Sequence, residues 1–355
     1  MDYDIITVQL VPEKKGLFLK HSEYEITSKK FKCTTFRRYN DFVNLHNLLV
    51  TQAPYRMIPR LPPKQLMLDS LLEERRRGLQ RWLRIVSRHP VLGTDPLFIT
   101  FLTDSTSEHQ EHLRELYSRE LDEFSKLSED VELPLEDQGR LAASREMMRT
   151  MLNLVTKLMR LADQQAVRQQ NQGKDMEEMS SILRHIGSSN KMLGDSTFSE
   201  MAVGFKEVAT LSEKSALHQH NAINERFHLL IDVLTAHSDL CDRVDKGIVS
   251  DHQKALSKML NLNKQRMKGV IRGTAAESVA AIHEKEVAQT GVVGNLGRRS
   301  AFSLHCVLQE TSLAQEYLRV LPSILLSFTY EQNQGNANMV KIWETIVAKE
   351  ADKLN

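Results

Sequence analysis

The 355-residue sequence predicts a small α+β domain of about 100 residues, followed by an elongated all-α bundle of three long helices. Residues 1–104 hold three stretches rich in β-branched and aromatic residues and then helical patterns, whereas from residue 138 onward Pro322 is the only proline. Charge divides the chain similarly: residues 1–104 carry 17 Lys and Arg against 11 Asp and Glu, and the remainder carries 30 against 35. A basic front domain on a larger acidic part indicates that the front domain meets an anion.

Three strands are expected at the front of the chain. Their sequences are "DIITVQLV" (4–11), "GLFLKHSEYEITS" (16–28) and "KFKCTTFRRY" (30–39). Each alternates roughly between apolar and polar residues, as strands with one buried face do, and a turn-like Pro12–Gly16 separates the first two. Together they predict a three-stranded sheet.

Helices follow the strands. Asn40 is a good N-cap, and after it Phe42, Leu45, Leu48 and Leu49 share one helical face. Residues 53–64, "APYRMIPRLPPK", contain four prolines and exclude regular structure.

A second helix is expected over residues 70–89, where Ser70 and Glu73 match a capping box and Pro90 lies just past the end. Its apolar stripe consists of Leu72, Leu79, Leu83 and Val86. Asp95 and Pro96 then begin a last short helix. These elements complete the compact domain, which we place at residues 1–104.

Residues 105–137 form an acidic linker: the stretch 108–137 has 11 acidic residues against 3 basic ones. An imperfect stripe at helical spacing predicts that the linker holds an amphipathic helix of its own. The stripe comprises Leu113, Leu116, Leu121, Phe124 and Leu127.

The bundle occupies residues 138–355, with glycine-containing breaks expected near 187–204 and 287–297. Apolar spacing close to 3.5 residues over this length is typical of a coiled-coil-like bundle. Helices of about 40 residues would each span roughly 60 Å. Because three such helices have more apolar stripe than they can cover for one another, we expect a dimer.

Several function classes are disfavoured. The N-terminus does not resemble a signal peptide, no apolar run would span a bilayer, and Cys33, Cys241 and Cys306 fit reduced thiols, so we expect a cytosolic chain. No phosphate-binding loop, hydrolase or metalloprotease motif is present, so we expect no enzyme and no cofactor. His218 and His220 point apart on a helix, so no metal site is expected, and His237 fits a hydrogen-bonded core residue. We also expect no nucleic-acid partner.

The stretch "FRRYNDF" (36–42) places two arginines and a tyrosine at a strand–helix junction. One interpretation is that Arg37 and Arg38 are exposed charges and Tyr39 packs in the core. The other is a phosphate clamp, since a guanidinium matches a phosphate and a tyrosine face can carry a ring.

The order of "RRYNDF", a proline-rich loop ending in "LPPK", and "EERRRGLQRWL" resembles the PX domain of the sorting nexins. With its helical second half, nearly the whole chain resembles a sorting nexin of the PX-BAR class. "PYRMIPRLPPK" and "FSLHCVLQET" make it most similar to the subgroup of sorting nexin eight and yeast Mvp.

The resemblance implies a phosphatidylinositol 3-phosphate pocket. In it Arg38 would bind the 3-phosphate, Tyr39 would stack on the inositol ring, Lys64 would meet the 1-phosphate, and Arg75 would bind the ring's 4- and 5-hydroxyls. Arg37, Arg76 and Arg77 lie beside these positions without an assigned role, and we interpret them as solvated or general membrane contacts.

Two further features bear on the front domain. Leu66, Met67 and Leu68 follow the lysine directly, and they either pack in the core or enter the lipid beside the headgroup. The proline loop also matches two patterns for SH3 docking, R-x-x-P-x-x-P and P-x-x-P-x-K. These patterns use Arg56, Pro59, Pro62 and Lys64.

Residues 254–272 contain six basic residues and no acidic one: Lys254, Lys258, Lys264, Arg266, Lys268 and Arg272. They form either an ordinary solvated face or, as the BAR resemblance implies, a surface applied to anionic lipid near the tip of a curved dimer. A further hypothesis is that the acidic linker pairs with a basic face and holds a closed form.

The sequence as a whole is interpreted as a peripheral protein on the cytosolic face of early endosomes. Its PX domain would bind phosphatidylinositol 3-phosphate, and its BAR homodimer would sense or generate curvature during sorting and transport. The alternative is a cytosolic coiled-coil scaffold whose front domain binds a protein through the proline-rich loop.

Overall fold

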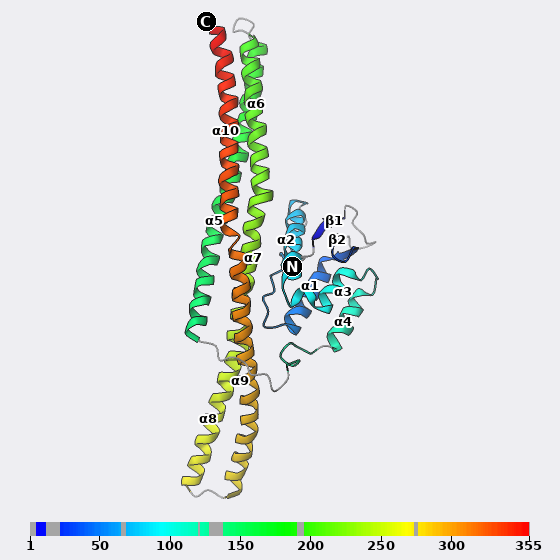
Figure 1. Ribbon diagram of the computed structural model, residues 1–355, viewed down its shortest axis with the longest axis vertical. Helices are drawn as coiled ribbons and strands as arrows, with labels where there is room; N and C mark the ends of the chain where they lie inside the picture. Colours follow the sequence, from blue (N-terminus) through cyan, green and yellow to red (C-terminus); the bar gives the residue numbers. More distant parts are fainter. Residues whose placement is uncertain are drawn as a thin grey trace. The chain divides into compact units, whose positions relative to one another are not determined.

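The computed structural model describes residues 5–11, 22–64, 69–119, 121–127, 138–189, 195–272 and 276–354 (Figure 1). The chain divides into two compact units. The first combines Met1–Arg149 with Asp232–Ala314, and the second combines Thr150–Ile231 with Gln315–Asn355. Residues from the helical half of the sequence therefore belong to the same unit as the α+β front.

The sheet of the first unit confirms the predicted three strands, β1 (Ile6–Leu10), β2 (Glu23–Ser28) and β3 (Cys33–Arg38). All pairs are antiparallel in the order β1-β2-β3. The register sets Glu23 opposite Arg38 at the end of β3. That pairing places an acidic side chain beside the arginine of the strand–helix junction.

Four helices follow the strands in the chain: α1 (Tyr39–Gln52), α2 (Asp69–Arg88), α3 (Pro96–Thr103) and α4 (His109–Arg119). A short 3-10 turn, η1 (Leu92–Thr94), precedes α3. Phe42 of α1 lies at the centre of the core, in edge-to-face contact with Tyr24, Trp82 and Phe101. The Asp95 carboxylate accepts a 2.8 Å hydrogen bond from the Leu97 amide, as the predicted cap requires.

Two predicted helix caps are wrong. Because α1 begins at Tyr39, Asn40 lies inside that helix and not at its N-cap. Because α2 begins at Asp69, Ser70 lies inside the helix and not at its N-cap. Within the acidic segment, α4 packs its Leu113 and Leu116 side chains against the core of the front domain.

Besides α1 to α4, the first unit contains α5 (Gln138–Ser189) up to Arg149, α7 (Glu225–Val244) from Asp232 onward, the π-helical turn η4 (Asp245–Val249), α8 (Ser250–Ile271) and α9 (Ala276–Leu318) up to Ala314. Helices α8 and α9 run side by side (Figure 1), joined by a 3.0 Å hydrogen bond from Gln289 to the Ala255 carbonyl. At Gly247 the backbone leaves helical geometry, with φ −93° and ψ −108°, so α8 departs from the direction of α7.

The predicted break at 287–297 is wrong, because those residues lie inside α9. Helix α8 instead ends at Ile271, and α9 begins at Ala276. A glycine in a helix interior is less favourable than alanine by about 1 kcal/mol. The three glycines Gly291, Gly294 and Gly297 therefore predict a helix break in the sequence. Packing explains part of the outcome: a Cβ at Gly297 would lie 3.3 Å from the His252 ring, so this glycine lets α9 approach α8 closely.

The second unit is all-helical. It contains most of α5 (Gln138–Ser189), α6 (Asp195–His218), the π-helical turn η3 (Gln219–Asn224), the start of α7 and α10 (Leu321–Leu354). Helices α6 and α10 lie side by side (Figure 1), with Phe205 and Trp343 in edge-to-face contact. The first predicted break is confirmed, since α5 ends at Ser189 and α6 begins at Asp195.

Candidate functional site

The predicted headgroup site lies where β3 passes into α1. Arg38 is the last residue of β3, its side chain is 56% exposed, and its Nε lies 3.6 Å from a carboxylate oxygen of Glu23. The Arg38 amide donates a 2.7 Å hydrogen bond to the Asp41 carboxylate, which fixes the first turn of α1. The guanidinium is therefore anchored at its backbone and open to solvent at its tip.

Tyr39, the first residue of α1, contacts both the proline-rich segment and helix α2. Its hydroxyl donates a 2.5 Å hydrogen bond to the Pro62 carbonyl of the proline-rich segment. The Arg75 guanidinium carbon from α2 lies 5.2 Å from the centre of the Tyr39 ring, within the range of a cation–π contact. Partial burial raises the pKa of Tyr39, so the phenol stays neutral and keeps its proton for Pro62.

Lys64 completes the group. Its ammonium lies 3.3 Å from the Asn40 side-chain oxygen, one residue beyond Tyr39, and it is exposed. Strand β3, helix α1, the proline-rich segment and α2 thus contribute one predicted residue each. Arg75 lies against the Tyr39 ring, Lys64 lies beside Asn40, and Arg38 directly precedes Tyr39, which is a group of residue types suited to a phosphorylated ring.

The neighbouring arginines correct the sequence interpretation. Arg37 is 2% exposed and donates from Nε and Nη2 to the Phe101 carbonyl, at 3.0 and 2.8 Å, and from Nη2 to the Asp104 carbonyl. It is a buried structural residue and not a solvated membrane contact.

Arg76 and Arg77 are also mostly covered. Both pair with Glu73, at 2.7 and 3.1 Å, and Arg76 donates to the Val8 carbonyl of β1. The hydrogen bond from Arg76 lowers the pKa of Glu73 to about 2, with further help from Arg77. These two residues attach α2 to the sheet and to its own first turns.

Leu66, Met67 and Leu68 lie outside the described residues, so their predicted insertion into lipid stays a prediction.

The proline-rich segment is packed against other parts of the first unit. Arg56, which an SH3 domain would need, is 9% exposed, and its Nε donates to both carboxylate oxygens of Glu123 at 3.0 and 2.8 Å. Pro59 is buried, and its carbonyl accepts a 2.9 Å hydrogen bond from Trp82. The segment therefore does not present the docking pattern of the alternative interpretation.

Sequence reasoning missed Arg243 of α7 and Glu310 of α9, which both contact this segment. Arg243 donates to the Pro54 and Arg56 carbonyls, and Glu310 accepts from the Met57 amide. No local pattern marks either residue, because each is one polar position in an ordinary amphipathic helix. Only the fold reveals their contacts.

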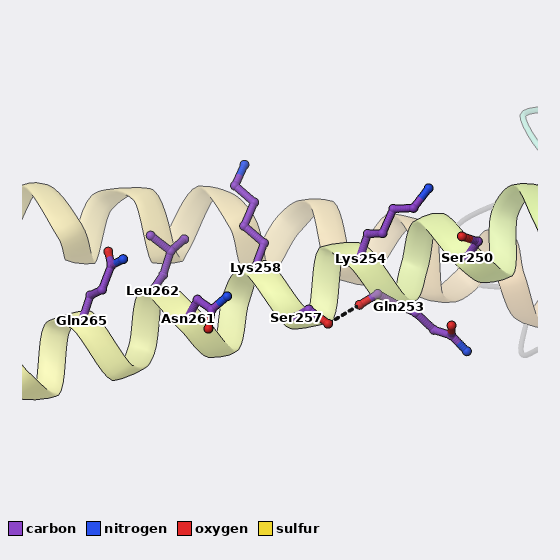
Figure 2. A pocket seen from close by; sticks show the side chains of 8 residues that line it. All are labelled: Ser250, Gln253, Lys254, Ser257, Lys258, Asn261, Leu262 and Gln265. Carbon is purple, nitrogen blue, oxygen red and sulfur yellow. Dashed lines mark hydrogen bonds between the residues drawn. The ribbon is translucent and has the colours of Figure 1, made fainter.

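The basic stretch 254–272 covers most of helix α8 and the residue directly after it. Figure 2 shows Lys254 and Lys258 projecting in the same direction from consecutive turns, beside a shallow open groove whose lining residues all belong to α8. Five of the six basic residues are exposed, whereas Arg266 is partly covered and pairs with Glu286 of α9 at 2.8 Å. Leu260, Met267 and Ile271 lie exposed along the same helix, at 56%, 54% and 80%.

Acidic residues of the linker do pair with arginines. Asp122 lies 2.7 Å from Arg299 of α9, and Glu123 pairs with Arg56. Neither arginine belongs to the basic stretch 254–272, so these pairs differ from the closed form that the sequence suggested.

Other predicted features are resolved as follows. His237 is buried and hydrogen-bonds the Thr311 hydroxyl at 2.8 Å, which confirms a core role. Cys241 and Cys306 are buried free thiols, whose pKa burial raises to about 11 and about 12, and Cys33 is a partly buried free thiol. Within the described ranges, no helix is both long and apolar enough to cross a bilayer, and no three His, Cys, Asp or Glu side chains are grouped to hold a metal ion.

Comparison with known proteins identifies the family to which this chain belongs. The PX domain family matches residues 25–105. Human sorting nexin-8 is 36% identical over 365 aligned residues, which cover 98% of this chain and 78% of the relative. Sorting nexin MVP1 of Candida glabrata is 25% identical, covering 97% of this chain and 73% of that protein.

A solved structure agrees in fold. The cryo-EM structure of the SNX-BAR Mvp1 tetramer matches with a TM-score of 0.77 and 20% identity, covering 96% of this chain and 99% of that one. A front PX domain and a helical region of the SNX-BAR type thus define the class of protein. The chain belongs to the sorting nexin family, and within it resembles sorting nexin-8 and MVP1.

Proposed function

We propose that this protein binds phosphatidylinositol 3-phosphate on the cytosolic face of early endosomes and contributes there to membrane sorting and transport. The observation that carries the proposal is that Tyr39 of α1 contacts both the proline-rich segment and Arg75 of α2, with Lys64 beside Asn40 and the exposed Arg38 at the end of β3.

Each residue of the site has a distinct task. The exposed Arg38 guanidinium binds the 3-phosphate, and Lys64 meets the 1-phosphate as a point charge. Tyr39 offers its ring to the inositol, while Arg75, whose guanidinium carbon lies 5.2 Å from the centre of the Tyr39 ring, binds the 4- and 5-hydroxyls. A phosphate at the 4- or 5-position would have to fit beside Arg75.

The helical residues 138–355 form the BAR domain in this proposal, and residues 105–137 connect it to the PX domain at 1–104. The second unit leaves large apolar side chains exposed at seven-residue intervals, Leu154 and Leu161 on α5 and Val340 and Val347 on α10. Such spacing is typical of helices that pack against a partner. A second copy of the chain is the proposed occupant, giving a homodimer that senses or generates curvature.

Helix α8 is the proposed second membrane contact. On the exposed side of α8, the apolar residues Leu260, Met267 and Ile271 adjoin the basic residues Lys264 and Lys268. Basic residues near an anionic lipid surface contribute about 1 kcal/mol each, and exposed apolar groups gain by entering the interface.

The test is flotation of the full-length chain with liposomes that contain or lack phosphatidylinositol 3-phosphate. Wild-type protein should float only with the lipid, and Arg38→Ala should lose at least about 1.5 kcal/mol, roughly tenfold in affinity, because a charged hydrogen bond is lost. Arg119→Ala, which removes an exposed arginine from α4, is the matched control and should bind like wild type.

Equal binding by Arg38→Ala and wild type would refute the pocket. Absence of binding by every variant, wild type included, would refute the proposed function.

A further inference from the structure

The proline-rich segment 53–64 has no helix or strand, so its backbone polar groups must find partners elsewhere. Side chains supply several of them. Pro59 and Pro62 accept from Trp82 and Tyr39 inside the PX domain. The beginning of the segment is held instead by side chains from the helical residues 232–314.

Arg243 of α7 binds two carbonyls of this beginning. Its Nε donates to the Pro54 carbonyl at 2.7 Å, and its Nη2 donates to the Arg56 carbonyl at 2.8 Å. One rigid guanidinium thereby fixes two peptide groups that are two residues apart.

Glu310 of α9 holds the next peptide group. Its carboxylate is 2% exposed and accepts from the Met57 amide, from Arg56 Nη1 and from His89 Nε2, at 3.2, 3.2 and 2.8 Å. The His89 Nδ1 atom accepts two backbone amides, those of Val91 and Leu92, so the ring proton lies on Nε2 and points at Glu310. This buried carboxylate therefore has three donors and a fixed orientation.

The held peptide groups are close in sequence to the headgroup site. Only four residues separate Met57 from Pro62, and Pro59 and Pro62 restrict the backbone of this stretch. Pro62 is itself confined, because a Cβ on Gly78 of α2 would lie 2.9 Å from it. A displacement at Met57 would consequently be passed to Pro62, to the Tyr39 hydroxyl and to Lys64.

We propose that Arg243 and Glu310, which belong to the helical half of the sequence, are positioning residues of the headgroup site. They hold segment 53–64 in the shape that orients Tyr39 and Lys64, so that headgroup affinity depends on the packing of α7 and α9 against the PX domain. The inference rests on the proposed function, because the consequence it assigns is a change in lipid affinity.

The first measurement is calorimetric titration of the full-length chain with a water-soluble, short-chain phosphatidylinositol 3-phosphate. A soluble ligand removes any contribution from dimer avidity or from α8. Arg243→Met should weaken binding by at least about fivefold, because a loosened segment must be ordered on binding. Arg243→Lys can restore one carbonyl contact and should fall between Arg243→Met and wild type.

The matched control is Asp232→Asn. It removes the 2.9 Å pair between Asp232 of α7 and Arg81 of α2, which also joins α7 to the PX domain without touching segment 53–64. This variant should bind the soluble lipid as wild type does. If circular dichroism shows that Arg243→Met does not fold, the lipid affinities of Arg243→Lys and Glu310→Gln are compared with that of wild type instead.

The second measurement is hydrogen exchange in the absence of lipid. Peptides covering residues 53–64 should exchange faster in Arg243→Met and Glu310→Gln than in wild type, and at the wild-type rate in Asp232→Asn. Unchanged exchange would overturn the positioning role whether or not the protein binds lipid. Faster exchange with unchanged lipid affinity would overturn the positioning role too. If the wild-type chain does not bind the soluble lipid, the proposed function itself is refuted.

Discussion

Arg37 and Arg38 are adjacent in the sequence and have opposite environments, because successive residues of a strand point to opposite faces of the sheet. Strand β3 turns Arg37 inward to the carbonyls of Phe101 and Asp104, and Arg38 outward beside Glu23. Burial lowers the pKa of Arg37, and nearby Asp41 and Asp104 offset part of that effect. One arginine supports the fold and the other is available to a ligand.

The two arginines should therefore respond differently to substitution. Arg37→Met leaves buried carbonyls without donors and should lower the free energy of unfolding by about 3 kcal/mol. Arg38→Ala, at an exposed position, should change it by less than about 0.5 kcal/mol. Urea unfolding followed by tryptophan fluorescence compares them, and equal destabilisation by both would contradict the assignment.

His237 is a second residue whose environment decides its behaviour. Burial lowers its pKa to about 4, and the positive charge of Arg145 adds to that effect, against an opposing influence of Glu310. Its ring faces the Thr311 hydroxyl of α9 and, on its own helix, the Cys241 sulfur at 3.9 Å. A neutral ring suits this site, and a protonated ring does not.

Stability should consequently fall as the pH falls below about 6.5, where the unfolded chain binds a proton at His237 and the folded chain does not. The loss should amount to about 2 kcal/mol at about pH 5 and level off near the folded pKa. Urea unfolding of wild type and His237→Gln at about pH 7.5 and about pH 5 isolates this part of the slope.

At the scale of elements, periodicity located the strands and most helices, but it did not locate every helix end. Residues 287–297 look like a break because three glycines occur within seven residues, yet α9 runs through them, with Gly297 against His252. The decisive contact is between residues far apart in sequence, which a local pattern does not contain. The same holds for the proposed site: "RRY" and "LPPK" mark the proposed pocket, whereas Arg243 and Glu310 are found only once α7 and α9 meet the proline-rich segment.

Helix α8 offers a prediction of its own. Exchanging Lys264 and Lys268 for glutamate reverses two exposed charges and should reduce binding to anionic liposomes by more than tenfold at about 0.1 M salt, less at high salt. Arg266→Gln, a residue already paired with Glu286, should have a much smaller effect. Flotation with and without phosphatidylserine measures both, and equal effects would remove α8 from the proposed membrane surface.

At the scale of the whole molecule, the proposed headgroup pocket and the proposed α8 surface would each bind a membrane weakly. A dimer that presents two pockets and two α8 surfaces to one membrane would gain affinity through effective concentration. The exposed apolar residues of the second unit give a way to separate these contributions. Leu326 and Tyr330 of α10 are 71% and 61% exposed and lie one helical turn apart.

Replacing both Leu326 and Tyr330 by glutamate should convert a dimer to a monomer, because four buried charges at a symmetric interface are repelled and desolvated. Analytical ultracentrifugation should then give about 41 kDa, the mass of one chain. Binding to liposomes should weaken by about 100-fold, while affinity for the soluble short-chain lipid should not change. Loss of soluble-lipid binding in the monomer would show instead that dimerisation shapes the pocket itself, and a variant that stays dimeric would place the interface elsewhere on the helices.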